Sequence, residues 1–183
     1  MAVFVSLFRG INVGGNHKVS MAELKKVHEA LGLRNVVSYI QSGNVVFHSD
    51  EADVIHLQGQ IETAFAEKFG FHSDVMLRTP ADLAEIIART PFQNQPDKEP
   101  RFLHVIFLAA RPDDAAQEAL LKTYVGPEEI FIIGQEMYIY YTEGAGRSKL
   151  TGSLIERKLK TVGTARNWNT VLQLHKMMQT PTS

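Results

Sequence analysis

A glycine-rich stretch near the start of the chain has residue types that bind anions. Residues 9–18 read Arg-Gly-Ile-Asn-Val-Gly-Gly-Asn-His-Lys, and Ser20 with Glu23 then form a capping box that starts a helix. Successive glycine amides can surround a phosphate, and a helix N-terminus adds a positive dipole. The stretch departs from the Walker pattern, because Lys18 comes three residues after Gly15 with no Ser or Thr directly behind it. The alternative is a loop whose glycines only supply positive φ. The candidate ligand-binding residues here are Arg9, Gly10, Asn12, Gly14, Gly15 and Lys18.

A second stretch, residues 144–149, combines flexible backbone with cations and hydroxyls. It reads Gly-Ala-Gly-Arg-Ser-Lys, and Thr151-Gly152-Ser153 follow. Two cations at a helix N-terminus are repelled by the positive end of the helix dipole, but they attract an anionic ligand, so their presence favours an anion-binding role. Alternatively the hydroxyls are helix N-caps, and Ser153 with Glu156 fits a capping box. The candidate binding residues are Arg147, Ser148 and Lys149.

The only tryptophan lies in a third polar segment, Arg166-Asn167-Trp168-Asn169. It could stack on a base or anchor a partner, or it could pack the last helix onto a sheet. Tyr138, Tyr140 and Tyr141 on one strand suggest an RNA-binding stacking platform, but RNP signatures are absent and core packing is favoured. All four residues of the segment are candidate ligand-binding residues.

Several chemistries find no support in the sequence. With no cysteine there is no disulfide, thiolate metal site or Cys nucleophile. The seven histidines lack HExxH or other close ligand spacing, so no metal site is predicted. There is no nucleophile elbow and no Ser-His-Asp order, so catalytic residues, cofactors and enzyme status stay unassigned.

Periodicity and turn residues predict an α+β fold with a repeated βαββαβ order. In the first half the expected elements are a strand from the N-terminus to residue 8, a helix from 21 to 31, strands at 36–41 and 44–48, a helix at 54–69 and a strand at 74–78. A short helix from Thr79-Pro80 and a proline-containing linker follow. In the second half they are a strand at 102–109, a helix at 112–124, strands at 129–133 and 137–142, a helix at 149–159, a strand at 162–167 and a terminal helix capped by Asn169 or Thr170.

This order predicts two tandem ferredoxin-like α/β plaits, each an antiparallel four-stranded sheet with two helices on one face. The expected domains are 1–78, a linker at 79–100, and 101–183 with the C-terminal helix. The topology brings the 9–18 loop next to the hairpin turn that carries Gln41, Ser42, Gly43 and Asn44. It likewise puts residues 144–149 near residues 166–169. We therefore add Gln41, Ser42 and Asn44 to the candidate ligand-binding residues.

Charge is distributed unevenly along the chain. The net charge of -1 argues against a generic polyanion binder. However, residues 1–48 carry a net +3, residues 49–143 a net -10 and residues 144–183 a net +6. The candidate loops lie in the two basic segments, where an anionic ligand is attracted. No apolar run approaches a membrane span and no signal peptide is evident, so a cytoplasmic location without a membrane partner is expected.

The chain closely resembles the bacterial DUF1697 family, a domain of unknown function. The resemblance rests on FRGINVGGNHKVSMAELKKVHEALGLRNVVSYIQSGNVVF, on GRSKLTGSLIERKL and on TARNWNTV, and it extends over essentially the whole chain. It implies two ferredoxin-like plaits and brings no established activity, substrate or catalytic residue.

Three hypotheses for function follow. The first is binding of a phosphorylated or nucleotide-like ligand at the basic, glycine-rich loops. The second is RNA or DNA binding through the sheets and the basic C-terminal segment. The third is a protein interaction module whose loops are purely structural. Oligomeric state is not predicted.

Overall fold

The computed structural model describes residues 1–179 of the chain, which form a mixed α/β structure with two four-stranded antiparallel sheets. Contacts divide the chain into two compact units. Unit 1 comprises Met1–Ala84 with Gln173–Ser183, of which 173–179 are described, and unit 2 comprises Glu85–Leu172.

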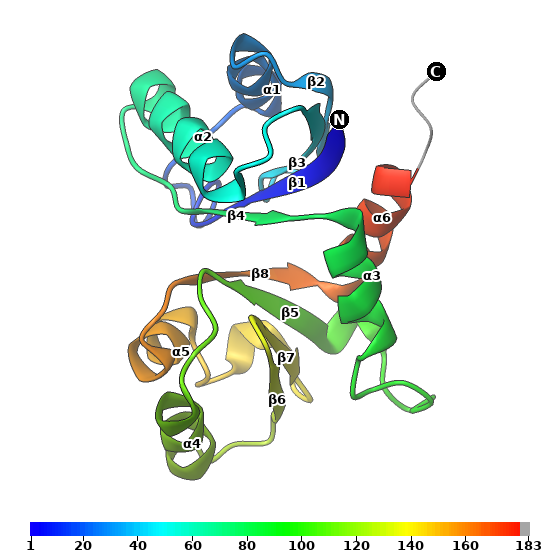
Figure 1. Cartoon of the computed structure of the whole chain (residues 1–183). Helices are drawn as coiled ribbons and strands as arrows, with labels where there is room; N and C mark the ends of the chain where they lie inside the picture. The colour runs from blue at the N-terminus through cyan, green and yellow to red at the C-terminus, as the bar shows by residue number, and fades with distance from the viewer. Residues whose placement is uncertain (180–183) are drawn as a thin grey trace. The chain divides into compact units, whose positions relative to one another are not determined.

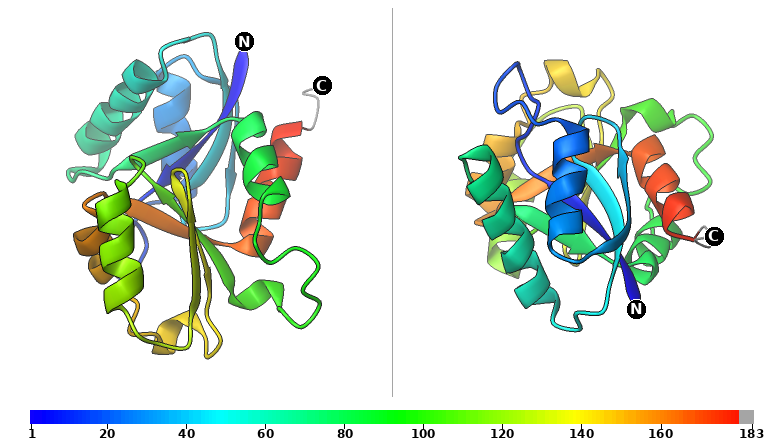
Figure 2. Two further views of the ribbon diagram at one scale, coloured as in Figure 1. Left: turned by 60° about the horizontal axis from the view of Figure 1, so that its bottom comes forward. Right: turned by 90° about the horizontal axis from the view of Figure 1, so that it is seen from above.

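Unit 1 contains a β-strand, helix, two strands, helix and strand in the predicted order. The elements are β1 (Ala2–Phe8), α1 (Met21–Ala30), β2 (Arg34–Tyr39), β3 (Asn44–Ser49), α2 (Val54–Phe69) and β4 (Val75–Arg78). Its strand order is β2-β3-β1-β4, with every neighbouring pair antiparallel. Both helices lie on one face of this sheet, as Figures 1 and 2 show.

Unit 2 repeats the arrangement with little sequence identity. The elements are β5 (Leu103–Leu108), α4 (Asp114–Thr123), β6 (Glu129–Ile133), β7 (Glu136–Tyr140), α5 (Gly152–Leu159) and β8 (Gly163–Asn167). The strand order β6-β7-β5-β8 is again antiparallel throughout, and α4 and α5 lie on one face (Figure 1). The helices α3 (Pro80–Ala88) and α6 (Trp168–Gln179), with two short 3-10 turns at Pro100–Phe102 and Ala145–Arg147, complete the described chain.

The core of unit 1 follows from the alternation along β1. Phe4 stacks on Phe47 of the neighbouring strand β3 at a centroid distance of 5.8 Å, and Phe8 contacts the tilted ring of Phe65 on α2 at 5.1 Å. Ser6, between them, contacts the buried imidazole of His28 on α1. Burial of these aromatic side chains contributes to the stability of the packing between the helices and the sheet.

The segment predicted as a linker packs closely against the second sheet. Phe92 is buried and contacts the rings of Phe131 and Tyr140, and the Tyr138 hydroxyl donates to the Ile86 carbonyl at 2.7 Å. The structure therefore groups residues 85–100 with unit 2 and assigns the second half of α6 to unit 1, whereas the predicted ranges were 1–78, 79–100 and 101–183. Proline spacing marks an irregular backbone, but only side-chain packing reveals where that backbone is attached.

Helix ends were predicted correctly where one capping residue dominates. The Ser20 hydroxyl accepts from the Glu23 N–H, and Gly70 ends α2 in the left-handed conformation, both as predicted. The prediction for α6 was wrong: β8 runs directly into this helix, and the Asn167 side chain, rather than Asn169 or Thr170, accepts from the Asn169 N–H at 3.0 Å.

The start of α5 also differs from the prediction. The helix begins at Gly152 because the preceding 3-10 turn and the extended Ser148 end the loop later than expected. Thr151 is the N-cap, since its hydroxyl accepts from the Leu154 N–H at 3.2 Å. The capping box of Ser153 with Glu156 does not form, and Glu156 instead accepts from the Gly163 N–H at 3.2 Å.

Removing the Thr151 hydroxyl should therefore destabilise the protein. We expect Thr151→Ala to lower the free energy of unfolding by about 1 kcal/mol, because it leaves a first-turn N–H without its acceptor. Ser153→Ala is the matched control and should change stability by less than about 0.5 kcal/mol. Urea denaturation of the two variants checks that Thr151 is the N-cap. Equal losses of stability in both variants would contradict it.

Candidate functional site

A pocket at the start of α1 gathers four of the predicted residues. It has a volume of ≈ 450 Å³ and is lined by Asn12, Gly15, Lys18, Val19, Ser20 and Gln41. We call it the α1-entry pocket. The topology argument was correct here, because the 9–18 loop and the β2–β3 turn lie side by side at one edge of the first sheet, joined by a hydrogen bond from the Asn12 side chain to the Gln41 carbonyl.

The paired glycines of the loop form the tip of a small hairpin. Val13 and Asn16 form an isolated antiparallel bridge, with the Asn16 N–H donating to the Val13 carbonyl at 3.0 Å. Gly14 and Gly15 between them have φ values of +57° and +77°. Positive φ at both central positions is the signature of a type I′ turn, which favours glycine. Backbone conformation therefore accounts for this glycine pair.

Asn12 holds the loop in place. Its amide nitrogen donates to the carbonyls of Val19 at 3.0 Å and Gln41 at 2.8 Å, and its side-chain oxygen accepts from the Val19 N–H at 2.7 Å. These bonds join the loop to both the start of α1 and the β2–β3 turn. Asn12 is thus a positioning residue that fixes the wall of the pocket.

The turn between β2 and β3 is held by a buried amide. Asn44 is fully buried, and its side chain donates to the Tyr39 carbonyl and the Ser42 hydroxyl, both at 2.9 Å. An alanine Cβ at Gly43 would lie 2.5 Å from the Ile11 side chain, so the loop and the turn meet at a position that only glycine fits. Ser42 and Asn44 therefore maintain the shape of the turn, while the exposed Gln41 reaches the pocket.

The two cations of the first loop have different surroundings. Arg9 lies 3.7 Å from the Asp74 carboxylate, and its carbonyl accepts from the buried Ser73 hydroxyl at 2.7 Å. Lys18 is exposed and forms no ion pair within residues 1–179. Gly10, also exposed, has a φ of +72° at the bend after Arg9. Lys18 is therefore the cation that the α1-entry pocket offers to a ligand.

The second predicted cluster contains a carboxylate as well as cations. Arg147 and Lys149 are exposed, but the Ser148 hydroxyl donates to Glu128 and accepts from the Leu150 N–H at 3.0 Å. Glu128 also accepts from the Tyr124 hydroxyl at 2.5 Å, and these hydrogen bonds hold its pKa below the usual value against the opposing effect of burial. An ionised carboxylate at this loop disfavours an anionic ligand.

In the third predicted segment, residues 166–169, Arg166 and Asn167 form hydrogen bonds within the protein. Arg166 is buried, which lowers its pKa to about 10, and its guanidinium donates to the Thr164 hydroxyl at 2.6 Å. Asn167 donates to the Arg101 carbonyl at 3.0 Å as well as capping α6, while Asn169 is exposed. Asn167 is therefore bound to the segment before β5, whereas Ser148 of the second predicted cluster is bound to Glu128.

Aromatic side chains that could stack on bases are mostly buried. Trp168 is 9% exposed and lines a small pocket of ≈ 200 Å³ together with Phe92 and Lys98. Tyr138, Tyr140 and Tyr141 are buried as well, and burial raises the pKa of Tyr141 to about 12. The three tyrosines are therefore packed in the interior, as the sequence predicted.

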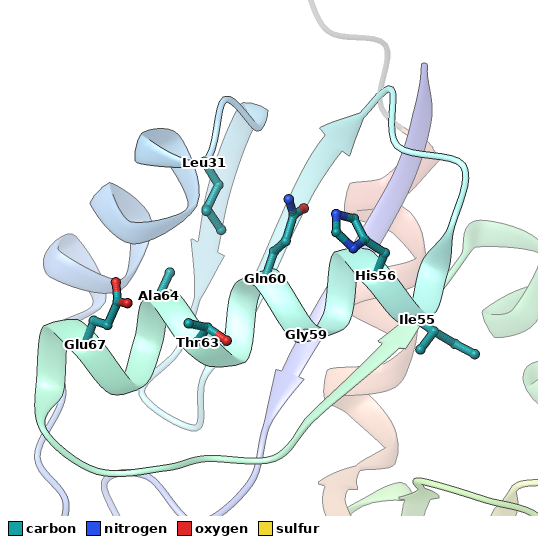
Figure 3. Close-up of a pocket in the computed structure, with 8 residues that line it drawn as sticks. All are labelled: Leu31, Ile55, His56, Gly59, Gln60, Thr63, Ala64 and Glu67. Carbon is teal, nitrogen blue, oxygen red and sulfur yellow. The ribbon is translucent and has the colours of Figure 1, made fainter.

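Sequence reasoning missed two surface features of unit 1. One is a hollow of ≈ 550 Å³ along the outer face of α2 beside Leu31, which Gly59 leaves open (Figure 3). The other is a group of three side chains, Glu62, His72 and Asp74. His72 and Asp74 are two residues apart, which is a detectable signal, but Glu62 joins them only because α2 packs beside β4.

No helix within residues 1–179 is long and apolar enough to cross a membrane.

Among solved structures, the chain is similar to the conserved bacterial protein SP0830 from Streptococcus pneumoniae, with 25% sequence identity and a TM-score of 0.77. The alignment covers 98% of this chain and 99% of that one. None of the curated proteins matches the chain. The model of DUF1697, described as a protein of unknown function, matches residues 1–138. The chain therefore belongs to the DUF1697 family.

Proposed function

We propose that the protein binds a phosphorylated or nucleotide-like anionic ligand at the α1-entry pocket. The observation that carries the proposal is the lining of this pocket, where an unpaired lysine, a glycine backbone and an amide side chain meet without any carboxylate. We further infer that each sheet with its two helices is a ferredoxin-like plait, on the basis of element order and strand order. In such a plait the loop after the first strand and the central turn share one edge, which is where this pocket lies.

Hydrogen-bond donors at the pocket support an anion. Of the residues that line the pocket, Gly15 and Lys18 have backbone N–H groups with no protein acceptor within residues 1–179. The Lys18 ammonium and the Gln41 side chain add charged and neutral donors at the same place. Phosphate oxygens accept several hydrogen bonds at once, and bonds to charged groups are the stronger ones. This set of donors therefore fits a phosphate group.

Electrostatics around the start of α1 also favour an anion. The carboxylate nearest in sequence is Glu23, which lies 3.0 Å from the Lys26 ammonium and 3.1 Å from that of Lys68. These hydrogen bonds and charges lower the pKa of Glu23, and the two lysines more than balance its negative charge. The N-terminal end of the helix dipole thus keeps its attraction for a negative group.

The test is a titration of inorganic phosphate, pyrophosphate and nucleoside phosphates monitored by thermal shift and calorimetry. We expect Lys18→Ala to weaken binding of the best of these probes by about 10-fold to 100-fold, the range for one charge-assisted hydrogen bond. Binding should also weaken with added salt.

Lys25→Ala is the matched control, because Lys25 is an exposed lysine on α1 that pairs with Glu29 and does not line the pocket. It should bind the probe like the unmodified protein. Lys149→Ala reports whether the second cluster is the anion site instead. Absence of binding by all probes, or loss of binding in Lys149→Ala but not in Lys18→Ala, would overturn the proposal.

A further inference from the structure

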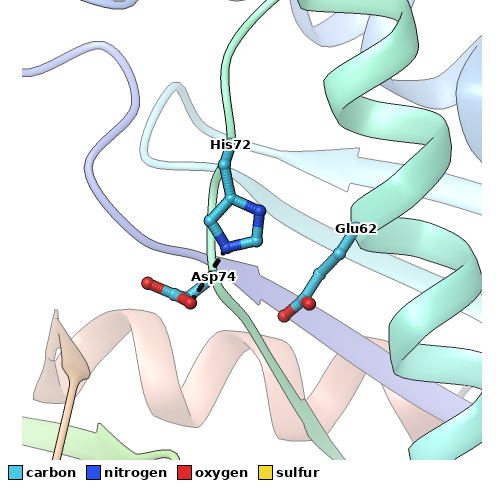
Figure 4. A group of neighbouring side chains, drawn as sticks. All are labelled: Glu62, His72 and Asp74. Atoms are coloured by element: carbon cyan, nitrogen blue, oxygen red, sulfur yellow. Dashed lines mark hydrogen bonds and ion pairs between the residues drawn. The ribbon is translucent and has the colours of Figure 1, made fainter.

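Three side chains from different parts of unit 1 converge on one point of its surface. Glu62 comes from α2, and His72 and Asp74 from the segment that enters β4 (Figure 4). One donor atom from each lies within 4.8 Å of the others, and His72 Nε2 is 3.0 Å from the Asp74 carboxylate. The group thus offers one imidazole nitrogen and two carboxylates.

The backbone that carries His72 and Asp74 is fixed by β1. Ser73, between them, is buried and its hydroxyl donates to the Arg9 carbonyl at 2.7 Å. The Arg9 N–H donates to the Asp74 carbonyl at 3.0 Å, which continues the β1–β4 pairing one residue before the start of β4. Because Ser73 points inward, the side chains on either side of it are directed outward together.

The Glu62 carboxylate is held in place by hydrogen bonds from neighbouring residues. Glu62 Oε1 accepts from the Val75 N–H at 2.9 Å and from the Gln58 side chain at 3.3 Å. Both bonds use the same oxygen, so the other oxygen can take a further partner. Hydrogen bonds of this kind from surrounding residues are what hold metal ligands in a fixed geometry.

We propose that Glu62, His72 and Asp74 bind a divalent transition-metal ion such as Zn²⁺. Zinc is bound by imidazole nitrogen and carboxylate oxygen at about 2.0–2.2 Å, which places neighbouring tetrahedral ligands about 3.3 Å apart. The His72–Asp74 separation of 3.0 Å is already near this value. All three ligand atoms lie within 4.8 Å of one another, so Glu62 has to approach by at most about 1.5 Å to reach this spacing.

Charge at the site also favours a cation. Two carboxylates share this point, and Arg9, 3.7 Å from Asp74, is the positive group that the structure shows beside them. His72 remains on the exposed side of the group, so an ion has a path from solvent and would keep at least one coordination position for water. Three protein ligands with an open position correspond to a reactive zinc site rather than a closed structural one.

The test is calorimetric titration of the metal-free full chain with Zn²⁺ in a non-chelating buffer. We expect one Zn²⁺ per chain, with affinity reduced at least 10-fold in His72→Ala and in Asp74→Asn. Substitution of Co²⁺ gives a second readout, because its visible absorption reports tetrahedral coordination. Mg²⁺ should compete poorly, since it requires octahedral oxygen ligands.

His56→Ala is the matched control, because His56 is an exposed histidine 3.9 Å from a single carboxylate, Glu51. It should bind Zn²⁺ like the unmodified protein, and so should Lys18→Ala, which separates this site from the anion site. Thermal melting without metal verifies that each variant is folded. No binding of Zn²⁺, or equal loss of affinity in His56→Ala and His72→Ala, would overturn the proposal.

Discussion

Lowering the pH from 7.5 to 4.5 should reduce the free energy of unfolding by about 2.5 kcal/mol through His28 alone. His28 is fully buried beneath the first sheet, and this burial lowers its pKa from 6.5 to about 4 against the opposing effect of the Leu24 carbonyl. Its Nδ1 is 2.8 Å from that carbonyl, so Nδ1 carries the proton and Nε2 accepts from the Ser6 hydroxyl at 2.9 Å.

The direction of the effect follows from proton binding in the two states. Well above pH 6.5 the imidazole is neutral in both the folded and the unfolded chain, and stability does not depend on its titration. Between pH 6.5 and about 4 only the unfolded chain binds the proton, so stability falls by about 1.4 kcal/mol per pH unit. Below that range both states are protonated and the loss levels off.

Urea denaturation at pH 7.5, 5.5 and 4.5 measures this loss. Other groups titrate in the same range, so the comparison is with His28→Gln, which puts a neutral hydrogen-bonding amide in place of the imidazole and removes the titration. The difference in stability between the two proteins should shrink by about 2.5 kcal/mol as the pH falls. A pH-independent difference for His28→Gln would contradict the prediction.

Gly43→Ala is expected to destabilise the protein by about 2–4 kcal/mol. Two costs combine at this position. The φ of +85° is unfavourable for alanine, and the new Cβ would lie 2.5 Å from Ile11 and 3.0 Å from Phe8. Since Ile11 is itself buried, it has little room to move away. The loop that forms the α1-entry pocket would shift with Ile11, so anion affinity should fall together with stability.

Gly10→Ala separates the two costs. Gly10 has a similar φ of +72°, but no atom lies within 4 Å of its added Cβ. This variant should lose about 1–2 kcal/mol, the conformational cost alone. Thermal and urea denaturation of both variants give the comparison. If the two losses are equal, the contact between the turn and Ile11 is not tight, and the argument for a fixed pocket wall fails.

The positions of helices and strands were predictable because local interactions decide them. The bounds of α2 and β3 follow from the spacing of apolar residues and from Gly70. Starts of helices were less predictable where several hydroxyl or amide side chains compete. Thr151 rather than Ser153 caps α5, and Asn167 rather than Asn169 caps α6, a choice between similar side chains that residue type alone does not make.

The pocket residues were predictable in part. Residue type and topology identified Lys18 and Gln41, since a basic loop and a central turn at one sheet edge must be neighbours. They did not reveal that Asn12 and Asn44 use their side chains to hold the backbone. An amide side chain can donate a hydrogen bond either to a ligand or to a neighbouring backbone carbonyl. Which of the two it does depends on distances that are fixed only in the folded chain.

The sequence by itself determined the family, the repeated order of strands and helices, and the absence of cysteine chemistry, because these depend on residue identity and local periodicity. The tertiary structure decided which charged groups are accessible. Arg166 and Lys18 look alike as cations in a polar segment, yet one is buried against Thr164 and the other is exposed beside a pocket. It also brought Glu62 to His72 and Asp74. Burial and proximity are set by packing between elements distant in sequence, which no local pattern encodes.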